Sequence, residues 1–351
     1  MKTKTWALLA STLRHEWRYT STPVAFQPRY HIKPNIDHYY YSSLATHIPS
    51  QQLPVVDYFS RPSSTPSYTL SHGASGFAKN RRYTTPDVKR KRNHYCSVQI
   101  GEDAYFRRSD ALGVADGVGG WSDRKSADAA LYSRKLMHHA YLELERFENV
   151  EDPYFYKYDQ VDPVHILQNS YEKSMSEMKK DGILGSSTAC LAILRHSELR
   201  IANLGDCGVS VIRHHNYIFQ SEEQQHSFNF PFQLGPNSPD KPNDAQAKKG
   251  DIIIMGSDGL FDNLFDKDIL SIVQSHVASR RGQLLSLEPQ KISDELAERA
   301  KVVSRTKLDV ESPFQEKAVN EGIYYQGGKA DDISVLVAIV KDAESAPDRR
   351  L

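Results

Sequence analysis

The residues with the clearest potential for chemistry are aspartates that follow apolar, strand-like runs. In the motif VADGVGGW, Asp116 precedes glycines at positions 117, 119 and 120. A plain turn needs one glycine at most, because a single left-handed residue reverses the chain. Several glycines after a carboxylate indicate instead a backbone that closely approaches an ion or an anion. Taken alone, the motif also fits a strand followed by a loose turn.

The same arrangement recurs along the chain, with carboxylates flanking apolar runs. These carboxylates are Glu102, Asp103, Asp206, Asp258, Asp262 and Asp331. Carboxylates that share a site repel one another unless cations neutralise them. Oxygen ligands favour magnesium or manganese, and zinc is disfavoured because these motifs contain no histidine and only one cysteine, Cys207. We therefore expect one shared site for hard divalent ions.

Short apolar runs and helical patterns must position these carboxylates. Strands are predicted at 67–70, 104–107, 112–115, 188–194, 199–203, 209–213, 251–255 and 333–340, and helices at 126–147, 164–179, 267–278 and 292–303. Most strands follow one another through short turns, and the helices come in pairs. This order favours an α+β fold with antiparallel sheets covered by helices over a parallel βαβ sheet.

The bulk composition excludes several function classes. The 44 basic and 44 acidic side chains cancel, so the whole chain has no electrostatic attraction to nucleic acid or to an anionic membrane. Three cysteines without CxxC spacing indicate a reducing compartment. No apolar run approaches the ~18 residues of a membrane span. Motifs of serine hydrolases, P-loop proteins, dinucleotide-binding proteins and zinc proteases are missing from the sequence.

Residues 1–66 differ from the rest of the chain in charge. They contain seven Lys and Arg residues against three acidic ones, and apolar residues at 6, 9, 13 and 17 follow helical spacing. This pattern is typical of a mitochondrial transit peptide, although a tail without an address is the alternative. The stretch 39–66, rich in Tyr, Ser and Pro, suits a linker. We therefore predict a targeting segment and linker at 1–66, a catalytic domain at 67–342 and a tail at 343–351.

Several motifs, taken in order, resemble those of the metal-dependent type 2C serine/threonine protein phosphatases. These motifs are GED, VADGVGGW, GSSTACLAIL, NLGDCGVSVI, MGSDGLFDNL and ADDISVLVAIV. The likeness extends over about residues 67–341. ADGVGGW, the segment HSFNFPFQL at 226–234 and SYTLSHGASGFAK at 67–79 resemble the mitochondrial branch of that family.

The resemblance implies two stacked antiparallel sheets flanked by helix pairs, with two magnesium or manganese ions in a cleft at one edge. It implies that Asp116 bridges both ions, that the Gly117 carbonyl binds one, and that Asp258 and Asp331 bind the other. Glu102 and Asp103 would hold ion-bound waters. Asp206 and Asp262, with Asp258, match a weaker third site. A water activated by two ions would attack the phosphorus in line.

The resemblance further implies a monomer of the mitochondrial matrix that acts on phosphoserine and phosphothreonine of mitochondrial proteins. A link to mitochondrial metabolism, including coenzyme Q biosynthesis, is also implied. Two other readings remain open: a catalytically weak or dead binding module, and a phosphatase for small molecules. The segment 220–248 either shapes substrate access or merely packs as a loop.

Two departures from the family pattern concern catalysis. Val118 stands where many relatives have a histidine that protonates the leaving group, and Val98 stands where they have a phosphate-binding arginine. The candidates for a replacement cation are Arg107, Arg108 and the run 89–92. Without a histidine at position 118, the proton for the leaving group is expected to come from an ion-bound water.

Overall fold

The computed structural model describes residues 68–79, 94–121, 126–236, 250–279 and 287–343. The predicted targeting segment and nearly all of the predicted tail lie outside these residues. Among the described residues, no helix is both long and apolar enough to cross a bilayer.

The described strands form two five-stranded sheets in which every neighbouring pair is antiparallel. The first sheet has the order β1 (Tyr68–Phe77), β12 (Ile333–Asp342), β11 (Ile252–Gly256), β7 (Gly208–Arg213) and β8 (Asn216–Gln220). The second has the order β2 (Val98–Ile100), β3 (Asp103–Arg107), β4 (Ala111–Ala115), β5 (Ala189–Arg195) and β6 (Glu198–Leu204). A small separate hairpin joins β9 (Gln225–Ser227) to β10 (Phe230–Pro231).

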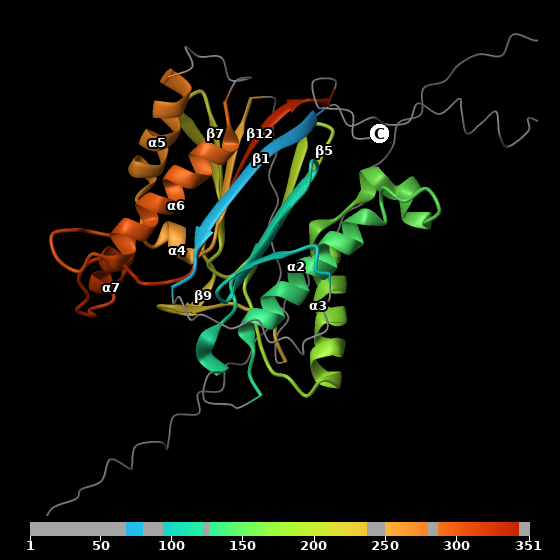
Figure 1. Cartoon of the computed structure of the whole chain (residues 1–351), viewed down its shortest axis with the longest axis horizontal. Helices are drawn as coiled ribbons and strands as arrows, with labels where there is room; N and C mark the ends of the chain where they lie inside the picture. Colours follow the sequence, from blue (N-terminus) through green and yellow to red (C-terminus); the bar gives the residue numbers. More distant parts are fainter. Residues whose placement is uncertain (1–67, 80–93, 122–125, 237–249, 280–286, 344–351) are drawn as a thin grey trace, which may run out of the picture. The chain divides into compact units, whose positions relative to one another are not determined.

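Helices cover the outer face of each sheet (Figure 1). The helices α2 (Ala129–Glu145) and α3 (Pro163–Lys180) pack on the second sheet. On the other side, α6 (Pro289–Arg305) packs on β1 and β12 and is paired with α5 (Asp266–Ser279). Shorter helices are α4 (Asp258–Phe261), α7 (Pro313–Asn320) and the 3-10 turns Gly119–Trp121 and Pro153–Gln160. The predicted fold of stacked antiparallel sheets flanked by helix pairs is confirmed.

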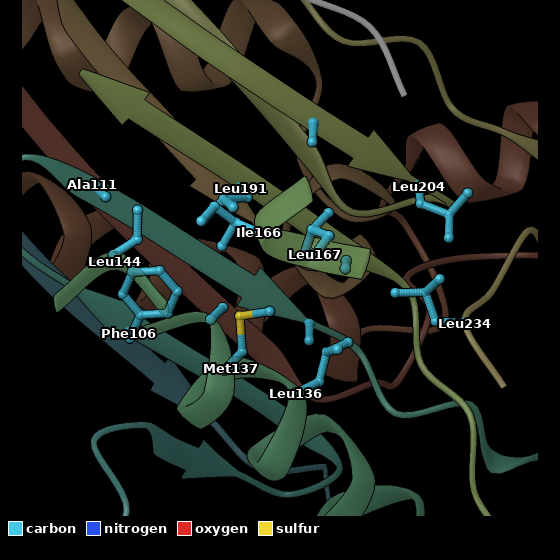
Figure 2. Close-up of a cluster of buried hydrophobic side chains, with 14 of the residues drawn as sticks. Phe106, Ala111, Leu136, Met137, Leu144, Ile166, Leu167, Leu191, Leu204 and Leu234 are labelled. Atoms are coloured by element: carbon cyan, nitrogen blue, oxygen red, sulfur yellow. The ribbon is translucent and has the colours of Figure 1, made fainter. Parts of the chain in front are cut away.

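Three apolar cores hold these layers together. The middle one joins the two sheets, with Leu112 of β4 and Leu336 of β12 fully buried in it. Figure 2 shows the core between the second sheet and α2 and α3, where Phe106 and Leu191 lie among Leu136 and Met137. The third lies between the first sheet and α5 and α6. Because central strands are buried on both faces, they read as continuous apolar runs, and every residue of β5 is buried.

All eight predicted strands and four predicted helices are present, but their bounds differ. β1 continues to Phe77 instead of ending at Leu70. Two of its added residues are glycines, and a Cβ on Gly73 would lie 2.3 Å from the backbone nitrogen of Gln290, so the start of α6 needs a bare backbone there. Several short or half-exposed elements have no long apolar run and were not predicted: β2, β8, the β9–β10 hairpin and α7.

Candidate metal centre

Strand pairing brings the predicted carboxylates to one edge of both sheets. In the second sheet Ala104 pairs with Ala115, so Asp103 and Asp116 are neighbours across β3 and β4. In the first sheet Gly256 of β11 pairs with both Gly208 of β7 and Val335 of β12. Residues just outside these strand ends therefore meet, and they include Asp206, Asp258 and Asp331.

Several carboxylate oxygens in this cluster are buried without a hydrogen-bond partner among the described residues. Asp103 is completely buried, and neither of its two oxygens is hydrogen-bonded. The same holds for Oδ1 of Asp206 and Oδ1 of Asp258, in side chains that are almost fully buried. Buried polar atoms are nearly always paired, so these unpaired carboxylate oxygens fit a site that binds cations.

The electrostatics of the cluster agree with this. Burial raises the pKa of Asp116, and the charges of Asp258, Asp103 and Asp206 raise it further. Burial, followed by the charge of Asp332, raises the pKa of Asp103. Burial and the charge of Asp258 raise the pKa of Asp206 to about 8. Because protons and divalent ions both relieve this repulsion, the donor set fits hard cations.

Two glycines permit the backbone approaches that build the cluster. A Cβ on Gly259, next to Asp258, would lie 2.0 Å from the carbonyl oxygen of Asp332. A Cβ on Gly117 would lie 2.6 Å from the Glu102 carbonyl oxygen and 2.7 Å from the Ala129 carbonyl oxygen. The glycine after each aspartate is therefore needed because another backbone segment occupies the space of a side chain.

Asp332 fixes the GED turn and was missed by the sequence analysis. Its Oδ2 accepts a hydrogen bond from the Glu102 amide at 2.7 Å, and its Oδ1 accepts one from the Lys79 amide at 2.7 Å. Gly101 has φ of +62°, and a Cβ there would lie 2.1 Å from Oδ1 of Asp332. The only signal in the sequence was the Asp331-Asp332 doublet, of which the resemblance assigned just the first member.

Two lysines in the cluster were also missed. The Lys329 ammonium forms ion pairs with Asp258, with Asp262 at 2.8 Å and with Asp331 at 3.5 Å. The Lys317 ammonium forms ion pairs with Glu223 and with Asp262 at 3.0 Å. Within the described ranges, no three carboxylate, imidazole or thiolate groups already surround one point closely enough to hold a metal ion. In this structure, the positive charges that pair with these carboxylates are lysine ammonium groups.

Both arginines considered for phosphate binding lie away from this edge. Asp103 begins β3 and Arg107 ends it, so Arg107 and Arg108 are at the opposite end of the strand. Arg108 is buried and forms ion pairs with Asp110 at 2.8 Å and with Glu148 at 2.9 Å. Those two candidates were wrong, because strand direction carries them away from the cluster. The run 89–92 lies outside the described residues.

The β9–β10 hairpin connects to the cluster through two neighbours. Phe228 packs on Phe314 of α7, with ring centroids 5.2 Å apart. Just after the hairpin, the Leu234 and Ser187 backbones exchange hydrogen bonds of 2.8 and 3.0 Å, and Ser187 Oγ donates to the Asp116 carbonyl at 2.7 Å. A cavity of about 270 Å³ lies beside the cluster, and its lining includes Asp206, Glu223, Phe261 and Lys317.

Comparison with known proteins gives the family of this arrangement. The family model described as protein phosphatase 2C matches residues 93–229 and 238–307. A protein phosphatase PTC7 homolog of Xenopus laevis is 36% identical over 294 residues, which cover 78% of this chain and 90% of that protein. The human PTC7 homolog is 37% identical over 261 residues, covering 69% of this chain and 80% of that protein.

Longer relatives and solved structures agree. The probable protein phosphatase 2C 80 of Arabidopsis thaliana is 36% identical over 68% of this chain, and the matched part is only 54% of that plant protein. The photosystem II phosphatase PBCP has a TM-score of 0.59 and 29% identity, covering 78% of this chain and 99% of that one. The catalytic domain of the phosphatase PstP, solved with two manganese ions, shares the fold with a TM-score of 0.51 and 17% identity over 78% of this chain and all of that one. This chain therefore belongs to the protein phosphatase 2C family, a family of metal-dependent serine/threonine protein phosphatases.

Proposed function

We propose that this chain hydrolyses phosphoserine and phosphothreonine in proteins, using two manganese or magnesium ions bound by the carboxylate cluster. The observation that carries the proposal is the set of buried, unpaired oxygens on Asp103, Asp206 and Asp258. The two manganese ions of PstP support the number and the type of ion. Asp116, Asp258 and Asp331 would be the main ligands, with the Gly117 carbonyl, Glu102 and Asp103 completing the two sites.

Bound divalent ions would supply an acidified water and neutralise charge on the phosphoryl group. The residues of the chain would position those ions. Asp116, directly after β4, feels the charges of Asp103 in its own sheet and of Asp258 and Asp331 from the other sheet. Gly259 holds the Asp258 turn against the segment 331–332, and Asp332 holds the Glu102 turn. Val118 offers no proton donor, so proton delivery to the leaving alkoxide falls to water in the site.

A protein substrate is favoured over a small molecule by the surroundings of the cluster. The cavity beside Asp206 extends under Glu223 and Lys317, and the hairpin side chain Phe230 is exposed. This extended surface gives a peptide chain contacts that a small ester would not use. The catalytically dead alternative is disfavoured because all the carboxylates predicted to bind metal are present and gathered at one edge.

We expect the purified chain to release phosphate from a phosphothreonine protein in manganese or magnesium and to lose this activity completely in EDTA. The measurement is kcat/KM for casein phosphorylated on serine and threonine, compared with 3-phosphoglycerate and glucose 6-phosphate. A higher kcat/KM for either small ester would support the small-molecule alternative. No release from any substrate with saturating manganese would support the dead module.

We further propose a mitochondrial address, in the matrix, carried by residues 1–66 with their basic, acid-poor composition. Phosphorylated proteins of mitochondrial metabolism, including those of coenzyme Q biosynthesis, are the substrates to which the resemblance points. Deleting residues 2–36 is expected to leave phosphatase activity intact and to keep the protein in the cytosol. Fractionation of cells expressing each form measures this, and unchanged import of the shortened chain would contradict the address.

A further inference from the structure

Lys329 is the most deeply placed positive charge in the carboxylate cluster. Its side chain is only 13% exposed, and its ammonium ion pairs with Asp258 and Asp262, which lie one helical turn apart at α4. The ammonium also forms an ion pair with Asp331, at 3.5 Å. Three carboxylates therefore surround this one ammonium.

The backbone of Lys329 is also held in place. Asn263 Oδ1 accepts a hydrogen bond from the Lys329 amide at 3.0 Å, and Asn263 Nδ2 donates one to the Lys329 carbonyl at 2.9 Å. Asn263 directly follows Asp262. The short segment 258–263 therefore supplies two of the three carboxylates that pair with the ammonium and the side chain that binds the Lys329 backbone. The ammonium also lies 5.0 Å from the ring centroid of Phe314. The ion pair is thus part of a built site rather than a chance contact of a long side chain.

The two oxygens of Asp258 differ in their surroundings. Oδ2 binds the Lys329 ammonium, whereas Oδ1 is buried and has no hydrogen-bond partner among the described residues. Asp262 is occupied on both sides, because Oδ2 binds Lys329 and Oδ1 binds Lys317. The peripheral carboxylates, Asp206, Asp258 and Asp262, are those that the sequence analysis assigned to a weak third ion.

We propose that the Lys329 ammonium is the resident cation of this peripheral set and stands in for a third divalent ion. This inference rests on the proposed function only in taking the inner carboxylates as the sites of two divalent ions. A tethered ammonium is always present at high effective concentration, so a free ion must displace it to bind the peripheral oxygens. Lys329 therefore fixes the number of divalent ions at two and stabilises the cluster when no ion is bound.

The test replaces the ammonium with an apolar side chain of similar length, Lys329→Met. Bound manganese is counted by equilibrium dialysis, and melting temperature is measured in EDTA and in manganese. We expect two ions per wild-type chain and a third, weaker one in Lys329→Met. In EDTA the variant should melt roughly 5 °C or more below wild type, because removing one partner of a buried pair leaves an unpaired charge. Manganese should then raise its melting temperature by more than it raises that of wild type.

Lys291→Met is the matched control, because Lys291 pairs with Glu288 at 2.9 Å on an exposed helix end. It should change neither the ion count nor the melting temperatures. Lys329→Met with Asp262→Asn removes one charge of each sign and should recover melting in EDTA. Equal ion counts and equal EDTA melts for Lys329→Met and wild type would overturn the inference. So would failure of the double variant to recover.

The failure of the proposed function has a different signature. A wild-type chain that binds no manganese would refute the two-ion proposal. The EDTA melts would still decide whether Lys329 neutralises the peripheral carboxylates. If Lys329→Met alone does not fold, the double variant supplies the melt, and Lys329→Gln, which keeps all three peripheral carboxylates, supplies the ion count.

Discussion

Replacing Asp116 with asparagine is expected to lower phosphoprotein turnover by roughly 100-fold or more and to weaken manganese binding. The change keeps the size of the side chain and removes the charge that lies between the two halves of the cluster. Activity is measured as kcat at saturating manganese, and affinity by calorimetric titration of the metal-free protein. Asp181→Asn is the control, because it removes one charge from an exposed position at the end of α3.

The fold of the Asp116→Asn variant is expected to survive, with a characteristic pH dependence in EDTA. The raised pKa of Asp116 means that its contribution to stability is fully present below the unfolded carboxyl pKa near 3.8. That contribution is lost as pH rises through the higher folded-state value. Wild-type melting temperature in EDTA should therefore fall as pH rises above that unfolded value, and the variant should show a smaller fall. Wild-type activity in the variant, or a variant melting far below wild type at high pH, would refute this account of the cluster.

Gly259→Ala is the second change with a large expected effect. The new Cβ would lie 2.0 Å from the Asp332 carbonyl oxygen, and the second-nearest atom is the carbonyl carbon of that residue. Backbone atoms cannot rotate away as a side chain can, so the start of α4 must move away from β12. We expect a loss of about 3 kcal/mol in the free energy of unfolding. Activity should fall as well, because Asp258 and Asp331 separate.

Gly120→Ala is the matched control for this substitution. It lies near the cluster, has no positive φ, and its nearest atom to an added Cβ is Val118 Cγ1 at 3.9 Å. Urea unfolding and manganese titration of both variants provide the measurement. Equal stabilities for the two variants would show that the close approach at Gly259 is not needed.

The central strands and the acidic residues could be predicted from the sequence because each leaves a local signal. β5 and β11 are buried on both faces, so each is a run of apolar residues. Asp116, Asp206 and Asp258 each stand beside a glycine. The lysines and Asp332 could not be predicted in this way. Lys329 reaches Asp258 and Asp262 across more than sixty positions, and a lysine beside two aspartates resembles an ordinary solvated turn.

Arg108 shows the opposite error. Its positive charge is close to Asp103 in the sequence but lies at the other end of β3. Arg108 stands five positions after Asp103 and was one of the candidate phosphate-binding cations. An extended strand of that length separates its ends by roughly 15 Å, so the two side chains serve different ends of the sheet. Arg108 instead belongs to a buried ion-pair group with Asp110, which also binds Arg195 at 2.9 Å.

The order of strands in the first sheet determines when the carboxylate cluster can assemble during synthesis. Among the described strands, β1 comes first along the chain and β12 last, yet β12 lies between β1 and β11. A growing chain therefore has no described partner for β1 in this sheet until residues 333–342 are available, and such distant pairings form slowly. Asp331 arrives with that same strand. A chain that stops before residue 331 thus lacks both the strand that pairs with β1 and one carboxylate of the cluster.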